Sequence, residues 1–149
     1  MTKMNIWNEI IDRMRKAPGK PLGEAVAEAT GGANLVDGKQ TWELVASWKH
    51  DIEVMKRCCT AEMETYAKTG LVPAPYYFER VAILARKLKD FDQEIAYCET
   101  YMRVVDDYYR VNNLPPEEGL KAGPRYRAIV KRLAKARLLA AQEPHEPSL

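Results

Sequence analysis

Histidine, cysteine and paired carboxylate residues are the side chains of this sequence that could carry out catalysis or bind a metal. The two histidines, His50 and His145, have no second histidine at ligand spacing, and Cys58 and Cys59 are adjacent, so they do not form a zinc-binding CxxC. The pairs Glu62/Glu64 and Asp106/Asp107 are expected to be solvated on helices. GEAVAEATGG lacks the lysine and spacing of a phosphate loop. The sequence therefore predicts no catalytic residue, no metal ligand and no cofactor.

The strongest charge pattern lies near the C-terminus, where residues 125–142 are expected to form a basic amphipathic helix. Between residues 121 and 142 there are seven basic residues and no acidic one, whereas the 149-residue chain has a net charge of only +2. Arg127, Lys131 and Lys135 recur every four residues and form one stripe. Such a helix can pair internally with the acidic remainder of the chain, bind an acidic protein or bind nucleic-acid phosphates. An anionic membrane surface is the least favoured partner.

The composition is that of a protein with one folded domain. Hydrophobic residues make up 46% and charged residues 30% of the chain, and its length suffices to bury a core without disulfides. The sequence MTKMNIWNEI resembles neither a signal peptide nor a membrane span, and three cysteines suit a reduced, cytoplasmic protein. We expect a single helical domain over residues 1–142, with short helices and loops in 1–40, and a disordered tail at 143–149.

Apolar spacing predicts short helices over residues 4–16 and 22–30, followed by a turn at 34–40. A stripe with steps of three or four then predicts one long helix over residues 41–69, capped by Asp37 or Thr41 and ended by Thr69-Gly70. The stripe at 42–66 would also suit the seam of a homodimer. Its members are Trp42, Val45, Trp48, Ile52, Met55, Cys59, Met63 and Tyr66, with Cys59 expected as a buried thiol.

Two further helices, over residues 76–88 and 93–111, surround the turn KDFD, with Asp92 as the candidate N-cap. A loop at 112–124 leads to the basic helix. No strand pattern of any length is seen. The predicted fold class is all-α, a small helical bundle that contains a helix-turn-helix hairpin.

Residues 75–108 of that hairpin resemble one divergent tetratricopeptide repeat, a helical unit of 34 residues that binds peptides in arrays. Ala85, Tyr101 and Asp106 depart from the usual residues, and so does Glu94, whose carboxylate must either reach solvent or pair with Arg80 or Arg86. A single unit cannot bury its own face, so flanking helices must cover it. The matching positions are Phe78, Val81, Ala82, Leu88, Phe91, Asp92, Ile95 and Cys98.

The resemblance implies that the first helix of the hairpin lines a binding groove. Together with the stripe of the basic helix, it gives a set of residues expected to contact a partner with an acidic surface. The alternative is an ordinary hairpin with a solvated face. The predicted partner-binding residues are Tyr76, Glu79, Arg80, Ile83, Arg86, Lys87, Arg127, Lys131 and Lys135.

These features favour a non-enzymatic protein–protein interaction module that acts by occupancy, as an adaptor, an assembly factor or an inhibitor. An inhibitor of phage or mobile-element origin that blocks a host protein would fit this size. The alternative is a nucleic-acid-binding accessory protein that uses the basic C-terminal helix. An enzyme would need a buried, perturbed acid in a cleft, and Glu94 is the first residue to consider for that role.

Overall fold

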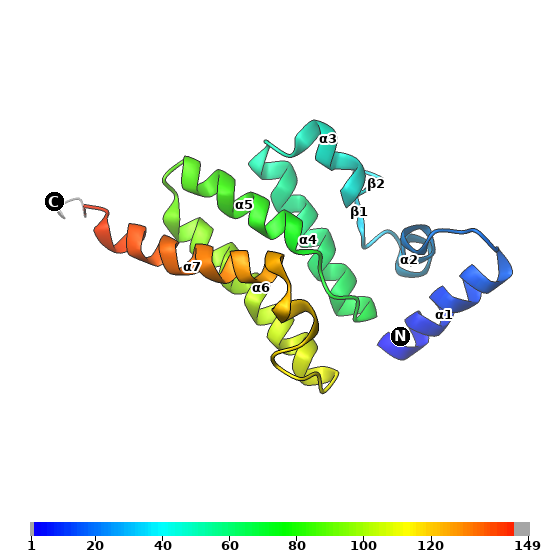
Figure 1. Ribbon diagram of the computed structural model, residues 1–149. Helices are drawn as coiled ribbons and strands as arrows, with labels where there is room; N and C mark the ends of the chain where they lie inside the picture. Colours follow the sequence, from blue (N-terminus) through cyan, green and yellow to red (C-terminus); the bar gives the residue numbers. More distant parts are fainter. Residues whose placement is uncertain (1, 145–149) are drawn as a thin grey trace. The chain divides into compact units, whose positions relative to one another are not determined.

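The computed structural model describes residues 2–144 and is all-α apart from one small hairpin of strands (Figure 1). Contacts divide the chain, for which one domain was expected, into two compact units, residues 1–77 and 78–149. We call them the N-terminal and the C-terminal unit. His145 and nearly all of the tail predicted at 143–149 lie outside the described residues.

The first two helices of the N-terminal unit confirm the sequence prediction. Helix α1 spans Lys3–Lys16, and α2 spans Leu22–Thr30. Ile6 and Ile10 of α1 pack in one buried cluster with residues of α2, because the apolar side chains of α1 recur at helical spacing. Helix α2 ends at Gly31, which has φ of 68°, a left-handed conformation that a glycine adopts without strain.

The segment after α2 departs from the long helix predicted over residues 41–69. Strands β1 (Leu35–Val36) and β2 (Lys39–Gln40) pair antiparallel around Asp37-Gly38. A 3₁₀ helix, η1 (Thr41–Leu44), and a single turn, α3 (Val45–Trp48), come next, and α4 begins only at Ile52 (Ile52–Thr69). The predicted long helix is therefore wrong in its continuity, because residues 41–48 form a 3₁₀ turn and a separate α-helical turn, and the regular helix begins at Ile52.

The interruption has a local cause in Asp51. Its backbone is extended, and its side chain accepts a hydrogen bond of 3.1 Å from the backbone N–H of Val54, so it caps α4 in place of Asp37 or Thr41. Trp42 and Trp48 are 66% and 46% exposed, which removes them from the predicted stripe. The homodimer seam based on residues 42–66 therefore loses its continuous helix. The predicted end is confirmed, since Gly70 has φ of 79°.

A helix-turn-helix hairpin forms the first part of the C-terminal unit. Helix α5 spans Pro75–Lys87, so the boundary between the units falls within its first turn, and α6 spans Phe91–Val111. The ring of Phe78 lies 5.2 Å from that of Tyr101, centroid to centroid, which joins the two helices. The cap of α6 is Asp90, and not Asp92 as predicted, since Asp90 accepts a hydrogen bond from the N–H of Gln93.

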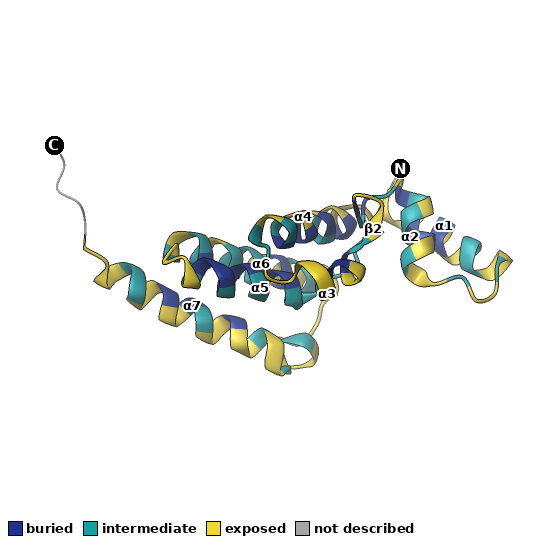
Figure 2. Cartoon of the chain, turned by 90° about the horizontal axis from the view of Figure 1, so that it is seen from above, coloured by how far each residue is buried: buried dark blue, intermediate teal, exposed yellow. Residues whose placement is uncertain are grey.

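The loop after α6 is fastened to that helix and sets the start of the last helix. The Tyr109 hydroxyl donates a hydrogen bond to the carbonyl of Glu118 and accepts one of 2.9 Å from the N–H of Lys121. A short 3₁₀ helix, η2 (Gly119–Ala122), leads into α7 (Pro124–Gln142). Figure 2 shows α7 buried along one side only, the side that carries Ile129, Leu133 and Ala136.

Candidate functional site

A groove between α5 and α7 of the C-terminal unit contains the densest group of the predicted binding residues. Its volume is about 450 Å³. Helix α7 forms the wall opposite α5, so the face of α5 that lines the groove is partly covered and partly open to solvent. We call this the basic groove, and its lining residues are Glu79 and Arg86 of α5 and Ala128, Lys131, Arg132 and Lys135 of α7.

An ion-paired carboxylate holds the two helices of the groove. Glu94, on α6, is completely buried, yet its Oε2 lies 2.9 Å from Nε of Arg86 and 2.9 Å from Nη1 of Arg132. Arg86 also donates a hydrogen bond of 3.3 Å to the backbone carbonyl of Arg132. Glu94 therefore joins all three helices, α5, α6 and α7, and its charge is compensated by two guanidinium groups.

The lysines of the groove have no such compensation. Lys131 and Lys135 are exposed, and within residues 2–144 neither forms a hydrogen bond or an ion pair. Glu79, the acidic residue in the lining, lies 3.5 Å from Arg125, which offsets its charge. The two lysines are four residues apart, so their Cα atoms are separated by about 6 Å along α7. The groove can therefore attract carboxylates or other anions.

The structure brings together four of the nine predicted partner-binding residues: Glu79, Arg86, Lys131 and Lys135. The others lie outside the lining. Tyr76 belongs to the N-terminal unit, where its ring packs edge-on against Tyr77. The remaining four are Arg80, Ile83 and Lys87 on α5 and Arg127 on α7.

The sequence prediction missed Arg132 as a lining residue. Arg132 belongs to the basic helix but lies off the stripe, and only the packing of α7 brings it to the carboxylate of Glu94. The available signal was Glu94 itself, whose carboxylate was expected either to reach solvent or to pair with a base. The prediction named Arg80 or Arg86 as its partner, and Arg86 is confirmed.

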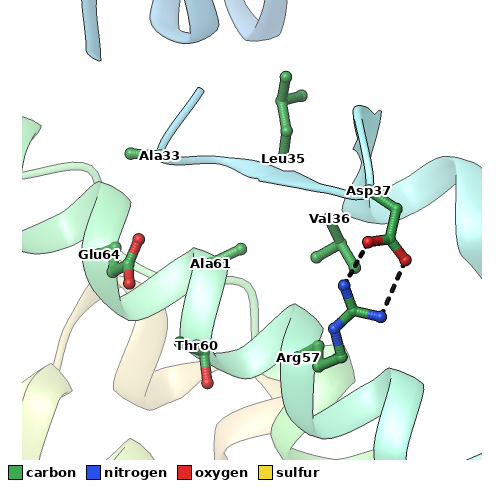
Figure 3. A pocket seen from close by; sticks show the side chains of 8 residues that line it. All are labelled: Ala33, Leu35, Val36, Asp37, Arg57, Thr60, Ala61 and Glu64. Atoms are coloured by element: carbon green, nitrogen blue, oxygen red, sulfur yellow. Dashed lines mark hydrogen bonds and ion pairs between the residues drawn. The ribbon is translucent and has the colours of Figure 1, made fainter. Parts of the chain in front are cut away.

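A second pocket, of about 220 Å³, lies beside the strand hairpin of the N-terminal unit (Figure 3). Arg57 of α4 reaches Asp37 with two hydrogen bonds of 2.9 and 2.5 Å, as the dashed lines show. The guanidinium group of Arg57 lowers the pKa of the Asp37 carboxyl through these bonds. Because the cation is already bridged, this pocket is a weaker candidate for an anion site than the basic groove.

The cysteines have the properties of core residues. Cys58, Cys59 and Cys98 are free and buried, which confirms the expectation for Cys59. Burial raises the pKa of Cys58 to about 11 and that of Cys98 to about 12, so both are thiols at neutral pH. Within residues 2–144, no group of three or more His, Cys, Asp or Glu could hold a metal ion. No helix in this part of the chain is long and apolar enough to cross a membrane.

Comparisons with models of protein families, with curated proteins and with solved structures found no match to this chain.

Proposed function

We propose that this chain is a non-enzymatic interaction protein that holds an acidic segment of a partner protein in the basic groove. The observation that carries the proposal is the pair of uncompensated ammonium groups, Lys131 and Lys135, beside the two arginines of the same groove. Such a chain acts by occupancy, as an adaptor, an assembly factor or an inhibitor of its partner.

The support comes from charge and from the stiffness of the walls. Arg86 and Arg132 are held by Glu94, so their side chains are ordered without a ligand. Binding of a partner therefore costs little side-chain conformational entropy at these two residues. The exposed lysines add long-range attraction, which speeds the encounter with an acidic surface. The resemblance to a tetratricopeptide repeat, if it holds for this hairpin, implies that its first helix lines the binding surface, and α5 supplies one wall of the groove.

A peptide-binding experiment with charge reversals tests the proposal. Fluorescence anisotropy would follow the binding of a labelled peptide rich in Asp and Glu, with a peptide of the same length rich in Asn and Gln as the control ligand. Lys131→Glu and Lys135→Glu should each weaken binding roughly tenfold, since each change removes one attraction and adds one repulsion. Arg127→Glu is the matched control, because Arg127 is exposed one turn earlier on α7 but does not line the groove.

The same variants separate the proposal from nucleic-acid binding. A single-stranded or duplex oligonucleotide bound along the stripe of α7 would contact residues 127, 131 and 135 alike, and its affinity would fall steeply with salt. Equal losses at all three positions, with the oligonucleotide preferred over the acidic peptide, would reject the groove proposal. Equal affinity for the Asp/Glu peptide and the Asn/Gln peptide would reject it as well.

A further inference from the structure

A pocket of about 280 Å³ lies entirely within the N-terminal unit, formed by α2, the segment of residues 34–42, α4 and the start of the linker at 71–72. It is separate from the basic groove, and its polar groups have the opposite character. Three side chains in its lining carry a carboxylate or an amide group: Glu62, Asn34 and Gln40.

Glu62 is a carboxylate without a cation. The sequence placed it on a solvated face, but in the structure it is only partly exposed and lines this pocket. Its oxygens accept hydrogen bonds from two neutral donors, the Thr41 hydroxyl at 3.0 Å and the Ala74 N–H at 3.1 Å. No basic group of residues 2–144 lies within 4.0 Å of it. Burial raises the pKa of Glu62, which reflects the cost of a negative charge there.

Asn34 contributes an acceptor that nothing in the described chain uses. Its Nδ2 donates a hydrogen bond of 3.0 Å to the carbonyl of Gly23, which fixes the orientation of the amide. Its Oδ1 is buried and has no hydrogen-bond partner, the one such side-chain atom among the described residues. Buried polar atoms are normally paired, so this oxygen is an exception, but it is closed off from solvent and a ligand in the pocket could reach it only if the wall moved.

The remaining walls suit the rest of an organic cation. The indole of Trp42 is 66% exposed, and its Nε1–H donates a hydrogen bond of 3.0 Å to Oε1 of Gln40, which holds the ring at the pocket. An aromatic face attracts ammonium and guanidinium groups. The apolar lining offers contact to an aliphatic stem and consists of Leu22, Val26, Leu71 and Val72.

We propose that this pocket binds an alkylammonium or alkylguanidinium group, with the charged head at the carboxylate of Glu62, the stem along the apolar wall, and the indole of Trp42 as the aromatic part of the lining. The ligand chemistry is that of a small organic amine or of a lysine or arginine side chain from another protein. This inference concerns a site apart from the basic groove and does not rest on the function proposed for that groove.

An NMR titration with simple probes tests it. n-Butylguanidinium and n-butylammonium chloride would be added to the full chain, with n-butanol as the neutral isostere and sodium chloride as the ionic control. We expect a saturable shift of the Trp42 indole N–H and of the Ala74 amide, with a dissociation constant of about 1 mM. The neutral isostere should bind at least about tenfold more weakly, because it lacks the charge that Glu62 attracts. A blocked tripeptide with a central arginine then shows whether a protein side chain can enter.

Three variants make the result decisive. Glu62→Gln should abolish the preference for the cations, whereas Glu64→Gln, a change on the same helix at an exposed position outside this pocket, should leave it unchanged. Trp42→Ala should weaken binding roughly two- to fivefold, because it removes the aromatic face. Trp42 is largely exposed, so this variant should fold normally and tests the pocket even if the Glu62 variant is misfolded. Equal binding of n-butanol, or the absence of saturable shifts at these two N–H groups, would overturn the proposal.

Discussion

Replacement of Glu94 by glutamine should destabilise the C-terminal unit more than any other single change from carboxylate to amide in that unit. Glu94 is completely buried between Arg86 and Arg132, at 2.9 Å from each. The amide leaves two guanidinium groups facing each other without the charge that compensates them.

The expected magnitude follows from the exposure of the arginines. Removing one partner of a fully buried ion pair costs about 3–5 kcal/mol of unfolding free energy. The side chains of Arg86 and Arg132 are 31% and 22% exposed, so water takes over part of the lost interaction. We therefore expect a loss of about 2–3 kcal/mol, which lowers Tm by roughly 5–10 °C for a chain of this size.

Urea unfolding followed by far-UV circular dichroism measures this loss. Glu99→Gln is the matched control, because Glu99 lies on the same helix and its ion pair with Arg137, at 3.0 Å, is solvent-exposed. It should cost less than about 1 kcal/mol. A Glu94→Gln variant within about 0.5 kcal/mol of wild type would refute the reasoning, and so would equal losses in the two variants.

A triple variant separates the contribution of the ion pairs to stability from the contribution of side-chain packing at the same site. Arg86→Met, Glu94→Leu and Arg132→Met together remove every charge of the cluster and keep apolar volume. Such replacements are often neutral or stabilising, so most of the stability lost in Glu94→Gln should return. The groove would nevertheless lose both arginines, and the acidic peptide should bind more weakly. Weak folding of the triple variant would show that the charges themselves organise the three helices.

Three further predictions concern the remaining buried or strained positions. The cysteine thiols should react with Ellman's reagent only after unfolding, because burial raises the pKa of all three; a fast reaction of the native chain at pH 8 would contradict this. Gly70→Ala should cost about 1 kcal/mol in urea unfolding, since φ of 79° strains an L residue although nothing lies within 4 Å of the added Cβ. Burial raises the pKa of Glu62 above its ordinary value of 4.5. Between the pKa of the unfolded chain and the higher pKa of the native state, the native carboxyl is still protonated while the unfolded one has lost its proton. The free energy of unfolding therefore decreases as the pH rises through this range. Relative to Glu62→Gln, the wild type should therefore gain unfolding free energy as the pH falls from 7 to 4, and parallel curves for the two proteins would count against a buried carboxyl.

Local signals in the sequence determined much of the secondary structure. Apolar spacing and glycines placed α1 and α2 and the end of α4 at Gly70, because these features act within one or two turns of a helix. The hairpin of α5 and α6 and the basic character of α7 were equally readable. The break before α4 was not, because the stripe continues in the sequence through residues 49–51 while Asp51 caps the helix and interrupts it.

Only the tertiary structure decided which charged groups meet. Arg132 and Glu94 are 38 residues apart, and nothing in the spacing of either helix indicates that α7 brings them to 2.9 Å. Glu62 and Glu64 looked alike in the sequence. In the structure, Glu62 is partly buried and accepts hydrogen bonds from neutral donors, whereas Glu64 is exposed. Periodicity determines the face of a helix on which a residue lies. Which residue of another helix contacts it depends on how the helices pack. The free energy of a charged side chain depends on that contacting residue.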